Sequence, residues 1–420
     1  LADFQAGTVD FADYPDIESW PARGDVAAGE DAYLAPFVDA NMDGKYRPAQ
    51  DGDYPCITGD QSLWWVMHDD GPHTESQGEP MEIQVEALSY AYDCATTNCP
   101  DSALDDASFL HFQVTNKSGK DYHDVYFTFW EDATLGFAFD NFVGSDSALG
   151  LAYVYNGDDE DEFSWGYGTD VPAFGALFLP NNTVSGMSAF MDHDRDIGEM
   201  GWPRQPEEFY NYMQAKFRWG SELVYNGSTG HPAHGPGPRG HFMYHGDPGC
   251  NGVTGWSEVA SGNQEGVRLF MASAGPFDLD AGEKVEFDVA FLTVWGGDHI
   301  ASVCSLKEKS AVVKNWWANQ NQGCFNVVTE GEEKDGGNGE IGEALWRLAP
   351  NPAEDQVAVV FSEVGKKKGA VTLLDLKGRI LQEIERPAGV MRLELNIEEL
   401  AAGMYMIQVN GGGGRLLMKR

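Results

Sequence analysis

An acidic, glycine-rich segment from Thr329 to Ala344 constrains the fold more than any other sequence feature, because it divides the chain. The segment reads TEGEEKDGGNGEIGEA and has no apolar periodicity, which is typical of a flexible linker. Residues 1–328 and 345–420 must then bury separate hydrophobic cores. A chain of 420 residues is long enough for two or three such domains.

The two parts differ in charge. The chain has 67 acidic and 27 basic residues, a formal net charge of −40. Residues 345–420 carry 11 basic and 9 acidic residues, which leaves 16 basic and 58 acidic residues, a net of −42, for residues 1–344. This excess argues against nucleic acid or an anionic membrane as a partner and favours bound divalent cations or a saline habitat. Because no apolar stretch reaches 18 residues, we expect no membrane insertion.

Residues 1–328 are predicted to form a large, all-β sandwich region, with two subdomains as an open alternative. The predicted strands are rich in β-branched and aromatic residues, and several alternate in polarity. They are 81–92, 108–116, 125–130, 151–155, 266–272 and 284–295. Helices are expected at 206–217 and 301–319, where apolar residues follow a helical period.

Residues 345–420 show a more regular pattern of short strands separated by turns with Gly or Pro. These strands are predicted at 357–361, 370–375, 379–385, 390–396, 403–409 and 415–419. Six or seven short strands in about 75 residues indicate a small immunoglobulin-like sandwich.

The C-terminal part also resembles a known family. LAPNPAEDQVAVVF at 348–361, VTLLDLKGRIL at 371–381, LNIEELAAGMYMIQV at 395–409 and the terminal GRLLMKR are similar to the type A sorting domain of the type IX secretion system of Bacteroidota. The resemblance implies export through the outer membrane by a translocon with shuttle and sortase components. The protein is then expected outside the cell or on the outer cell surface.

Residues 1 to about 325 resemble a recurrent β-rich region of such secreted proteins. The similarity rests on phrases such as ADFQAG and FQVTNKSGKDYHDVYFTFWEDATLG, and it brings no activity with it. Since the chain begins at Leu1 with no Met and no signal peptide, we expect a mature form or a fragment with further sequence upstream.

The sharpest chemical motif is DANMDGKY, which begins at Asp39. Oxygen ligands at its first, third and fifth positions, followed by Gly, match the spacing of a calcium-binding loop. The predicted calcium ligands are Asp39, Asn41, Asp43, the backbone carbonyl of Lys45, Asp51 and Asp53. Gln50 stands where a calcium loop usually has Glu, so Asp51 and Asp53 are expected to complete the shell. The alternative is a solvated acidic turn.

Weaker metal hypotheses involve three other groups. Glu131, Asp132, Asp140 and Asp146 form a second acidic group, in which Asp132, Asp140 and Asp146 are candidate ligands. Asp192, His193, Asp194 and Asp196 form a third. His231, His234, His241 and His245 surround a Gly-Pro loop, but no HExxH helix accompanies them.

Six cysteines without CxxC spacing are typical of disulfides in an exported protein. The short loops favour Cys94 with Cys99 and Cys304 with Cys324, which leaves Cys56 with Cys250. Two Asp-Ser-Ala sequences place Ser102 and Ser147 as candidate O-glycosylation sites by their similarity to the Bacteroidota acceptor.

The sequence contains no GxSxG elbow and no local Cys–His signature, so it gives no support for nucleophilic catalysis. We therefore expect a structural or adhesive surface protein that contacts copies of itself or surface glycans. The alternative is a carbohydrate-binding module or glycoside hydrolase of the same exported class, for which only the abundant Trp and acidic residues argue.

Overall fold

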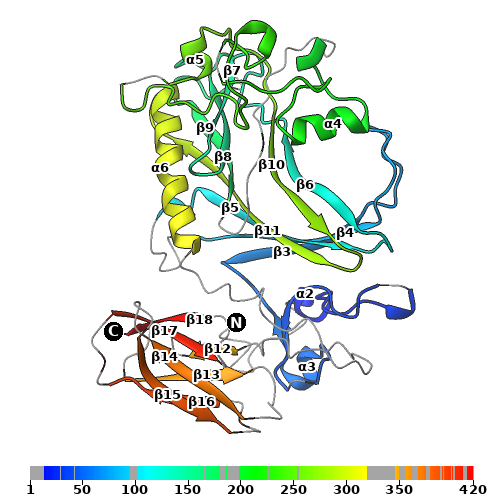
Figure 1. Cartoon of the computed structure of the whole chain (residues 1–420), viewed down its shortest axis with the longest axis vertical. Coiled ribbons are helices and arrows are strands. Elements are labelled where there is room, and N and C mark those ends of the chain that lie inside the picture. Colours follow the sequence, from blue (N-terminus) through cyan, green and yellow to red (C-terminus); the bar gives the residue numbers. More distant parts are fainter. Residues whose placement is uncertain are drawn as a thin grey trace. The chain divides into compact units, whose positions relative to one another are not determined.

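The computed structural model of the protein is shown in Figure 1. It describes residues 14–28, 30–41, 43–94, 102–163, 166–179, 186, 198–225, 227–252, 255–318, 346–349, 355–361, 368–374, 379–387, 390, 392–398, 400, 403–409 and 414–419. The chain divides into two compact units, Leu1–Val327 and Val328–Arg420. None of the helices in these ranges is both long and apolar enough to cross a membrane.

The first unit is built on a seven-stranded antiparallel sheet (Figure 1). Its strand order is β3-β4-β5-β11-β9-β8-β7. The strands are β3 (Gln61–His68), β4 (Ile83–Ala91), β5 (Ala107–Asn116), β7 (Asn141–Asp146), β8 (Leu151–Asn156), β9 (Pro172–Phe178) and β11 (Lys284–Trp295). In the centre, β11 pairs Ala290 with Phe109 of β5 on one side and with Leu177 of β9 on the other. Residues 287–290 of β11 are all buried, and because successive strand residues point to opposite faces, both faces of the strand are covered here, which explains its apolar run.

A two-stranded antiparallel ribbon covers one face of this sheet. It consists of β6 (Tyr122–Glu131) and β10 (Phe270–Leu279). The rings of Phe127 and Phe287, from the ribbon and from β11, stack with centroids 4.3 Å apart. The core between the layers is thus that of a β-sandwich, as predicted.

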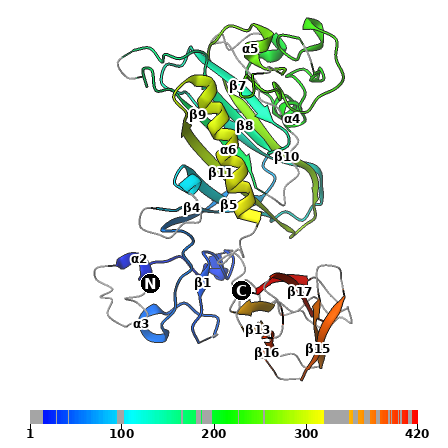
Figure 2. The ribbon, with the colours of Figure 1, turned by 90° about the vertical axis from the view of Figure 1, so that its left-hand side faces the viewer.

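Helix α6 (His299–Ala318) packs on the opposite face, against β8, β9 and β11 (Figure 2). Its buried side chains include Val303, Leu306, Val313 and Trp317, which recur at intervals of three, seven and four residues. This spacing keeps them on one side of a helix, where they join a second core.

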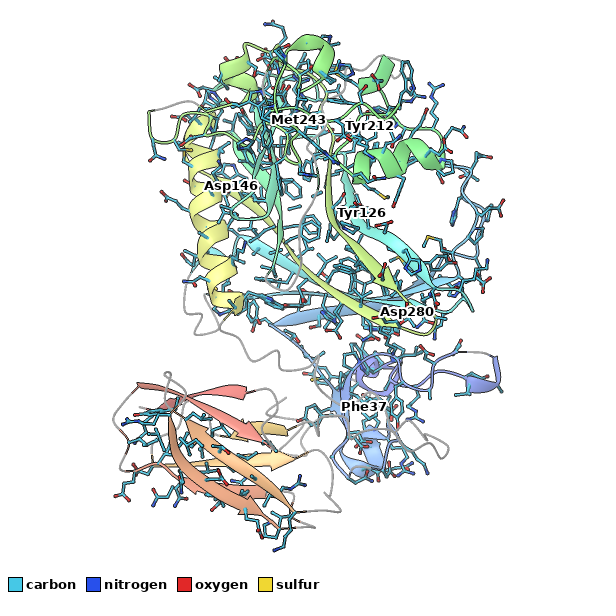
Figure 3. The ribbon with its side chains drawn as sticks, in the orientation of Figure 1. Phe37, Tyr126, Asp146, Tyr212, Met243 and Asp280 are labelled. Carbon is cyan, nitrogen blue, oxygen red and sulfur yellow. A yellow bond between two sulfur atoms is a disulfide. The ribbon has the colours of Figure 1, made fainter. Side chains whose placement is uncertain are left out.

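Short elements complete the first unit. They are α2 (Pro15–Glu18), η1 (Val26–Ala28), β1 (Phe37–Val38), α3 (Pro48–Asp51), β2 (Tyr54–Pro55), η2 (Ser102–Leu104), η3 (Gly198–Met200), α4 (Pro206–Met213), η4 (Pro232–His234) and α5 (Glu258–Ser261). Tyr212 and Met243 are buried in the loop-rich part near α4 (Figure 3).

The second unit contains two antiparallel sheets, ordered β12-β13-β16 and β15-β14-β17-β18. Their strands are β12 (Trp346–Ala349), β13 (Gln356–Phe361), β14 (Gly369–Leu374), β15 (Ile380–Arg386), β16 (Arg392–Asn396), β17 (Gly403–Val409) and β18 (Gly414–Lys419). Val359 and Leu395 of the first sheet share a core with Leu373 and Ile407 of the second. The all-β prediction is confirmed for both units, and this unit has the expected small two-sheet sandwich.

Candidate functional site

The predicted calcium loop is closed at its base by a short antiparallel pair of strands. Val38 of β1 lies opposite Tyr54 of β2, so the start and the end of the loop meet. Asp53 is completely buried, and its two carboxylate oxygens accept hydrogen bonds from the N–H groups of Ala40 (2.9 Å) and Arg47 (2.7 Å). This carboxylate therefore ties the two ends of the loop together.

Within the loop, the predicted ligands accept hydrogen bonds from its backbone. Asp39 Oδ2 accepts from the N–H of Gly44 (2.6 Å), and Asn41 Oδ1 accepts from that of Asp43 (3.1 Å). Asp43 Oδ1 accepts from the N–H of Lys45 (2.9 Å). The bonds to Asn41 and Asp43 each span two residues and define Asx turns, for which Asp and Asn are the favoured residues, whereas the bond to Asp39 spans the turn from Asp39 to Gly44. Gly44 is suited to its place because its φ is +71°.

Arg47 supplies a positive charge inside the same loop. Its guanidinium pairs with the carboxylates of both Asp43 and Asp51. The hydrogen bond to Asp51 is the main reason that the pKa of Arg47 is raised. The sequence motif did not reveal this pairing, and Arg47 competes with any bound cation for two of the predicted ligands.

The second acidic group does not form one site. Asp140 directly precedes β7 and Asp146 ends it, so six residues of extended chain, about 20 Å, separate the two carboxylates. Asp146 instead contacts Lys307 of α6 at 3.4 Å and lies beside that helix (Figure 3). The prediction that Asp132, Asp140 and Asp146 share an ion is wrong, because residues close in sequence on a strand are far apart in space. The third group, Asp192 to Asp196, lies outside the described residues.

Two of the four histidines in the histidine loop, His231 and His234, make hydrogen bonds within the protein. His231 Nε2 lies 2.7 Å from Glu199 Oε2, and its Nδ1 accepts from the N–H of Ala233 (3.2 Å). His234 Nδ1 lies 2.8 Å from the Thr229 hydroxyl. Both nitrogens of His231 therefore already have partners.

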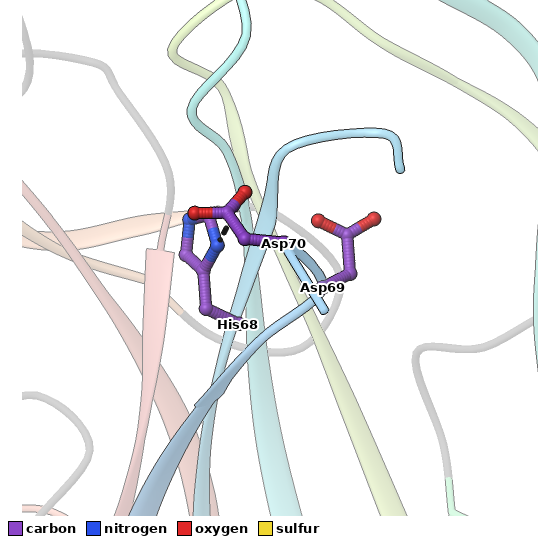
Figure 4. Close-up of side chains that lie close together, drawn as sticks. All are labelled: His68, Asp69 and Asp70. Atoms are coloured by element: carbon purple, nitrogen blue, oxygen red, sulfur yellow. Dashed lines mark ion pairs between the residues drawn. The ribbon is translucent and has the colours of Figure 1, made fainter. Parts of the chain in front are cut away.

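Two groups that the sequence did not suggest bring potential metal ligands together within the described ranges. In the first, ligand atoms of His68, Asp69 and Asp70 lie within 4.8 Å of one another. His68 faces Asp70 at 3.0 Å, whereas the carboxylate of Asp69 points aside (Figure 4). Asp69 instead accepts hydrogen bonds of 2.7 Å from the N–H groups of Met81 and Ile83, so it closes the turn between β3 and β4.

The second group combines Asp159, Asp298 and His299 at the start of α6. Asp298 Oδ1 accepts from the N–H of Ala301 at 2.7 Å, as a helix-capping residue does. His299 Nδ1 contacts Asp159, and this hydrogen bond is the main reason that the pKa of Asp159 is lowered. Both groups thus contain carboxylates that already have structural partners.

One disulfide differs from the predicted pairing. Cys250 is bonded to Cys304, with Cα atoms 5.4 Å apart, although 54 residues separate them. The predicted pairs Cys304–Cys324 and Cys56–Cys250 are therefore wrong. Preference for short loops misled the prediction, because the fold brings the loop before α5 against α6. Cys56 and Cys94 are also disulfide-bonded, and Cys99 and Cys324 lie outside the described residues.

Ser102 and Ser147, the candidate glycosylation sites, are both exposed. Ser102 begins η2, and Ser147 lies in the turn between β7 and β8. Either hydroxyl is therefore accessible to a modifying enzyme.

Comparison with solved structures gives only weak likenesses. A polysaccharide lyase is 10% identical with a TM-score of 0.21, and the alignment covers 80% of this chain and 34% of the lyase. The chain thus spans about a third of that protein. The adhesin domain of Epf from Streptococcus pyogenes is 7% identical with a TM-score of 0.15, and the alignment covers 85% of this chain and 91% of that domain. TM-scores this low carry no argument about fold or function.

The second unit provides the informative comparison. No curated protein matches the sequence. Residues 347–420, however, match the model of the secretion system C-terminal sorting domain family. This range covers the two sheets of the second unit from Arg347 onward. The chain therefore ends in a type IX secretion sorting domain and is a cargo protein of that system, exported to the cell surface or the extracellular space.

Proposed function

We propose that this exported protein is a structural or adhesive component of the cell surface, and that calcium bound in the Asp39–Asp53 loop stabilises its first unit. The proposal that the protein is adhesive is based on strand β3 at the edge of the sheet. It is terminal in the strand order, and one of its edges pairs with no other strand of the described sheet. An open edge of this kind accepts a strand from another molecule.

The side chains of β3 favour such a contact. Leu63, Val66 and Met67 are 64%, 43% and 47% exposed, which is high for apolar residues in a strand. The opposite edge of the sheet is covered, because the N–H of Val143 in β7 donates to Glu258 Oε1 at 2.8 Å. The partner is then a second copy of the chain or a surface ligand that binds along β3.

Substitutions on β3 test this proposal. Leu63→Lys places a charge on the open edge and should reduce self-association in sedimentation and adhesion of cells that display the protein. Val26→Lys is the matched control, since Val26 is 65% exposed but lies in η1. Equal behaviour of the two variants and the parent would remove β3 from the proposal.

The calcium part rests on the oxygen atoms gathered in the closed loop. Extracellular calcium sites bind with Kd values of about 10⁻⁴–10⁻³ M. At about 10 mM calcium, the ion would then stabilise the folded state by about 1.4–2.7 kcal/mol. EDTA should lower the melting temperature of the first unit, and Asp43→Ala should remove most of this difference.

A substitution of Arg47 gives a second test of calcium binding in the loop. Because its guanidinium occupies Asp43 and Asp51, Arg47→Gln should strengthen calcium binding by freeing both carboxylates. General screening of the −42 charge is the rival explanation, and sodium chloride at matched ionic strength separates the two effects. If sodium restores the melting temperature as fully as calcium, the loop is a solvated acidic turn.

Carbohydrate binding is the second candidate function. Trp295 and Tyr167 are 45% and 46% exposed and form an edge-to-face pair with ring centroids 6.3 Å apart. Exposed aromatic faces suit the apolar faces of sugar rings. Glycan-array binding that is lost in Trp295→Ala would favour this candidate, and a hydrolysis assay would distinguish a binding module from a glycoside hydrolase.

Export itself involves the translocon, shuttle and sortase of the type IX system. Deletion of residues 345–420 should leave a folded remainder in the periplasm, since the sorting domain is a separate compact unit. Surface labelling of the truncated protein measures this directly. Its appearance at the surface would show that residues 345–420 are not the export signal.

A further inference from the structure

Buried polar side chains gather at the end of the β7–β8 hairpin that is farthest from its turn. Asn141 of β7 lies directly opposite Asn156 of β8, and Asp140 precedes Asn141. Asp140, Asn141 and Asn156 are 3%, 1% and 1% exposed. Polar groups that are this deeply buried normally have all their hydrogen-bonding atoms paired.

Two of these side chains leave an acceptor oxygen unpaired. Asp140 Oδ2 accepts from Asn156 Nδ2 at 2.9 Å, but Asp140 Oδ1 has no hydrogen-bond partner among the described residues. Asn141 Nδ2 donates to the carbonyl of Phe137 at 3.0 Å, and Asn141 Oδ1 is likewise unpaired within the described part of the chain. Both unpaired atoms are acceptors, so a group that satisfies them must be a donor or a cation.

Two further carboxyl groups, those of Glu162 and Asp161, interact with Asp140. The carboxyl groups of Asp140 and Glu162 lie within hydrogen-bonding reach of each other. Asp161 is 1% exposed and accepts from the N–H of Phe137 at 2.7 Å. The backbone N–H of Phe137 is thus bound by Asp161 and its carbonyl by Asn141, and the charge of Asp161 acts on Asp140.

The pKa of Asp140 also indicates that its negative charge lacks a compensating positive charge. Burial raises the pKa of Asp140 to about 7, and the charges of Asp161 and Glu162 add to the effect, against the hydrogen bond from Asn156. Two adjacent carboxylates in such a place are stable when they share a proton or bind a cation.

We propose that Asp140, Glu162 and the amide oxygen of Asn141 bind a calcium ion. Oxygen atoms from carboxylates and an amide are the ligands that this hard cation takes, and it requires six to eight of them. Glu162 is exposed, so water can supply the remaining ligands from that side. The site is separate from the Asp39–Asp53 loop and does not depend on calcium binding there.

Calcium titration calorimetry on the full chain tests the proposal with Asp140→Asn. This substitution is isosteric and keeps an oxygen that can accept from Asn156. We expect the parent to bind one calcium ion more than the variant. Calcium should also raise the melting temperature of the parent more than that of the variant, whereas in EDTA the variant should be at least as stable as the parent.

Three further variants test whether the lost ion was bound at Asp140 and Glu162. Glu162→Gln at the exposed ligand should lose the same ion with less risk to folding. Asp146→Asn, at the other end of β7, should bind calcium as the parent does. In an Asp43→Ala background, Asp140→Asn should still remove one ion, which separates this site from the loop. If Asp140→Asn and Glu162→Gln bind as many ions as the parent, the two carboxyl groups share a proton and the proposal is wrong.

Discussion

Replacing Arg268 with Met should strongly destabilise the first unit. Its guanidinium lies against Glu258, with Nε to Oε1 at 2.9 Å and Nη2 to Oε2 at 3.0 Å. The side chains of Arg268 and Glu258 are 4% and 0% exposed. Glu258 also accepts from the N–H of Val143, so the pair covers the outer edge of β7.

The magnitude follows from what the substitution leaves behind. Arg268→Met leaves the Glu258 carboxylate buried without its cation, and breaking a buried pair in this way costs about 3–5 kcal/mol. The double variant with Glu258→Gln removes the charge but keeps an oxygen that accepts from Val143. It should therefore be more stable than Arg268→Met alone by about 2 kcal/mol.

Denaturant unfolding followed by tryptophan fluorescence measures these differences. Of the 12 tryptophans, only Trp346 lies beyond residue 327, so the signal reports on the first unit. Arg239→Met is the matched control, because the pair of Arg239 with Glu222 is 50% and 42% exposed and should contribute less than about 1 kcal/mol. If Arg268→Met lowers the free energy of unfolding no more than Arg239→Met does, or if the double variant is as unstable as Arg268→Met, then the buried charge of Glu258 does not need Arg268.

Three other outcomes can be measured. Burial raises the pKa of Glu131 from 4.5 to about 7, so the folded state is destabilised as pH rises from about 4.5 to 7 and the side chain loses its proton. Glu131→Gln, which has no charge to bury, should therefore raise the melting temperature at pH 8 but not at pH 4. Replacing Cys250 and Cys304 with Ser removes a disulfide between residues 54 positions apart in sequence. By the loss of chain-entropy restriction in the unfolded state, the free energy of unfolding measured in urea should fall by about 4 kcal/mol. Native protein should carry hexose on Ser102 or Ser147, whereas an intact mass equal to that of the bare chain would exclude glycosylation.

Much of the fold was readable from the sequence, and the failures have local causes. The predicted strand 284–295 matches β11, and the predicted helix 301–319 matches α6 closely. Strand β9 was missed because Gly175 interrupts its pattern, yet a Cβ there would lie 2.8 Å from Leu151 Cδ1 and 3.2 Å from Leu306 Cδ2. The glycine lets α6 and β8 approach the strand, a tertiary requirement that local propensity does not encode.

The ends of strands were harder to place. Strand β10 was expected to stop at Ala272 but runs to Leu279. Pro276 lies within this extension, although proline is disfavoured inside strands. It is tolerated here because the pairing of β10 with β6 shifts register between Ala274 and Phe277, where a ladder hydrogen bond is not required.

The acidic motifs show why sequence reasoning about metal sites is less secure. Asp39, Asp69 and Asp161 all direct their carboxylates at backbone N–H groups and so tie loops together. An Asx turn and a calcium loop use the same residue types at similar spacing, so the sequence cannot separate them. What separates them is whether each buried oxygen has a donor. Asp140 has one oxygen paired with Asn156 and one unpaired, with Glu162 alongside. A cation is therefore better supported at Asp140 than at the carboxylates whose oxygens the backbone already satisfies.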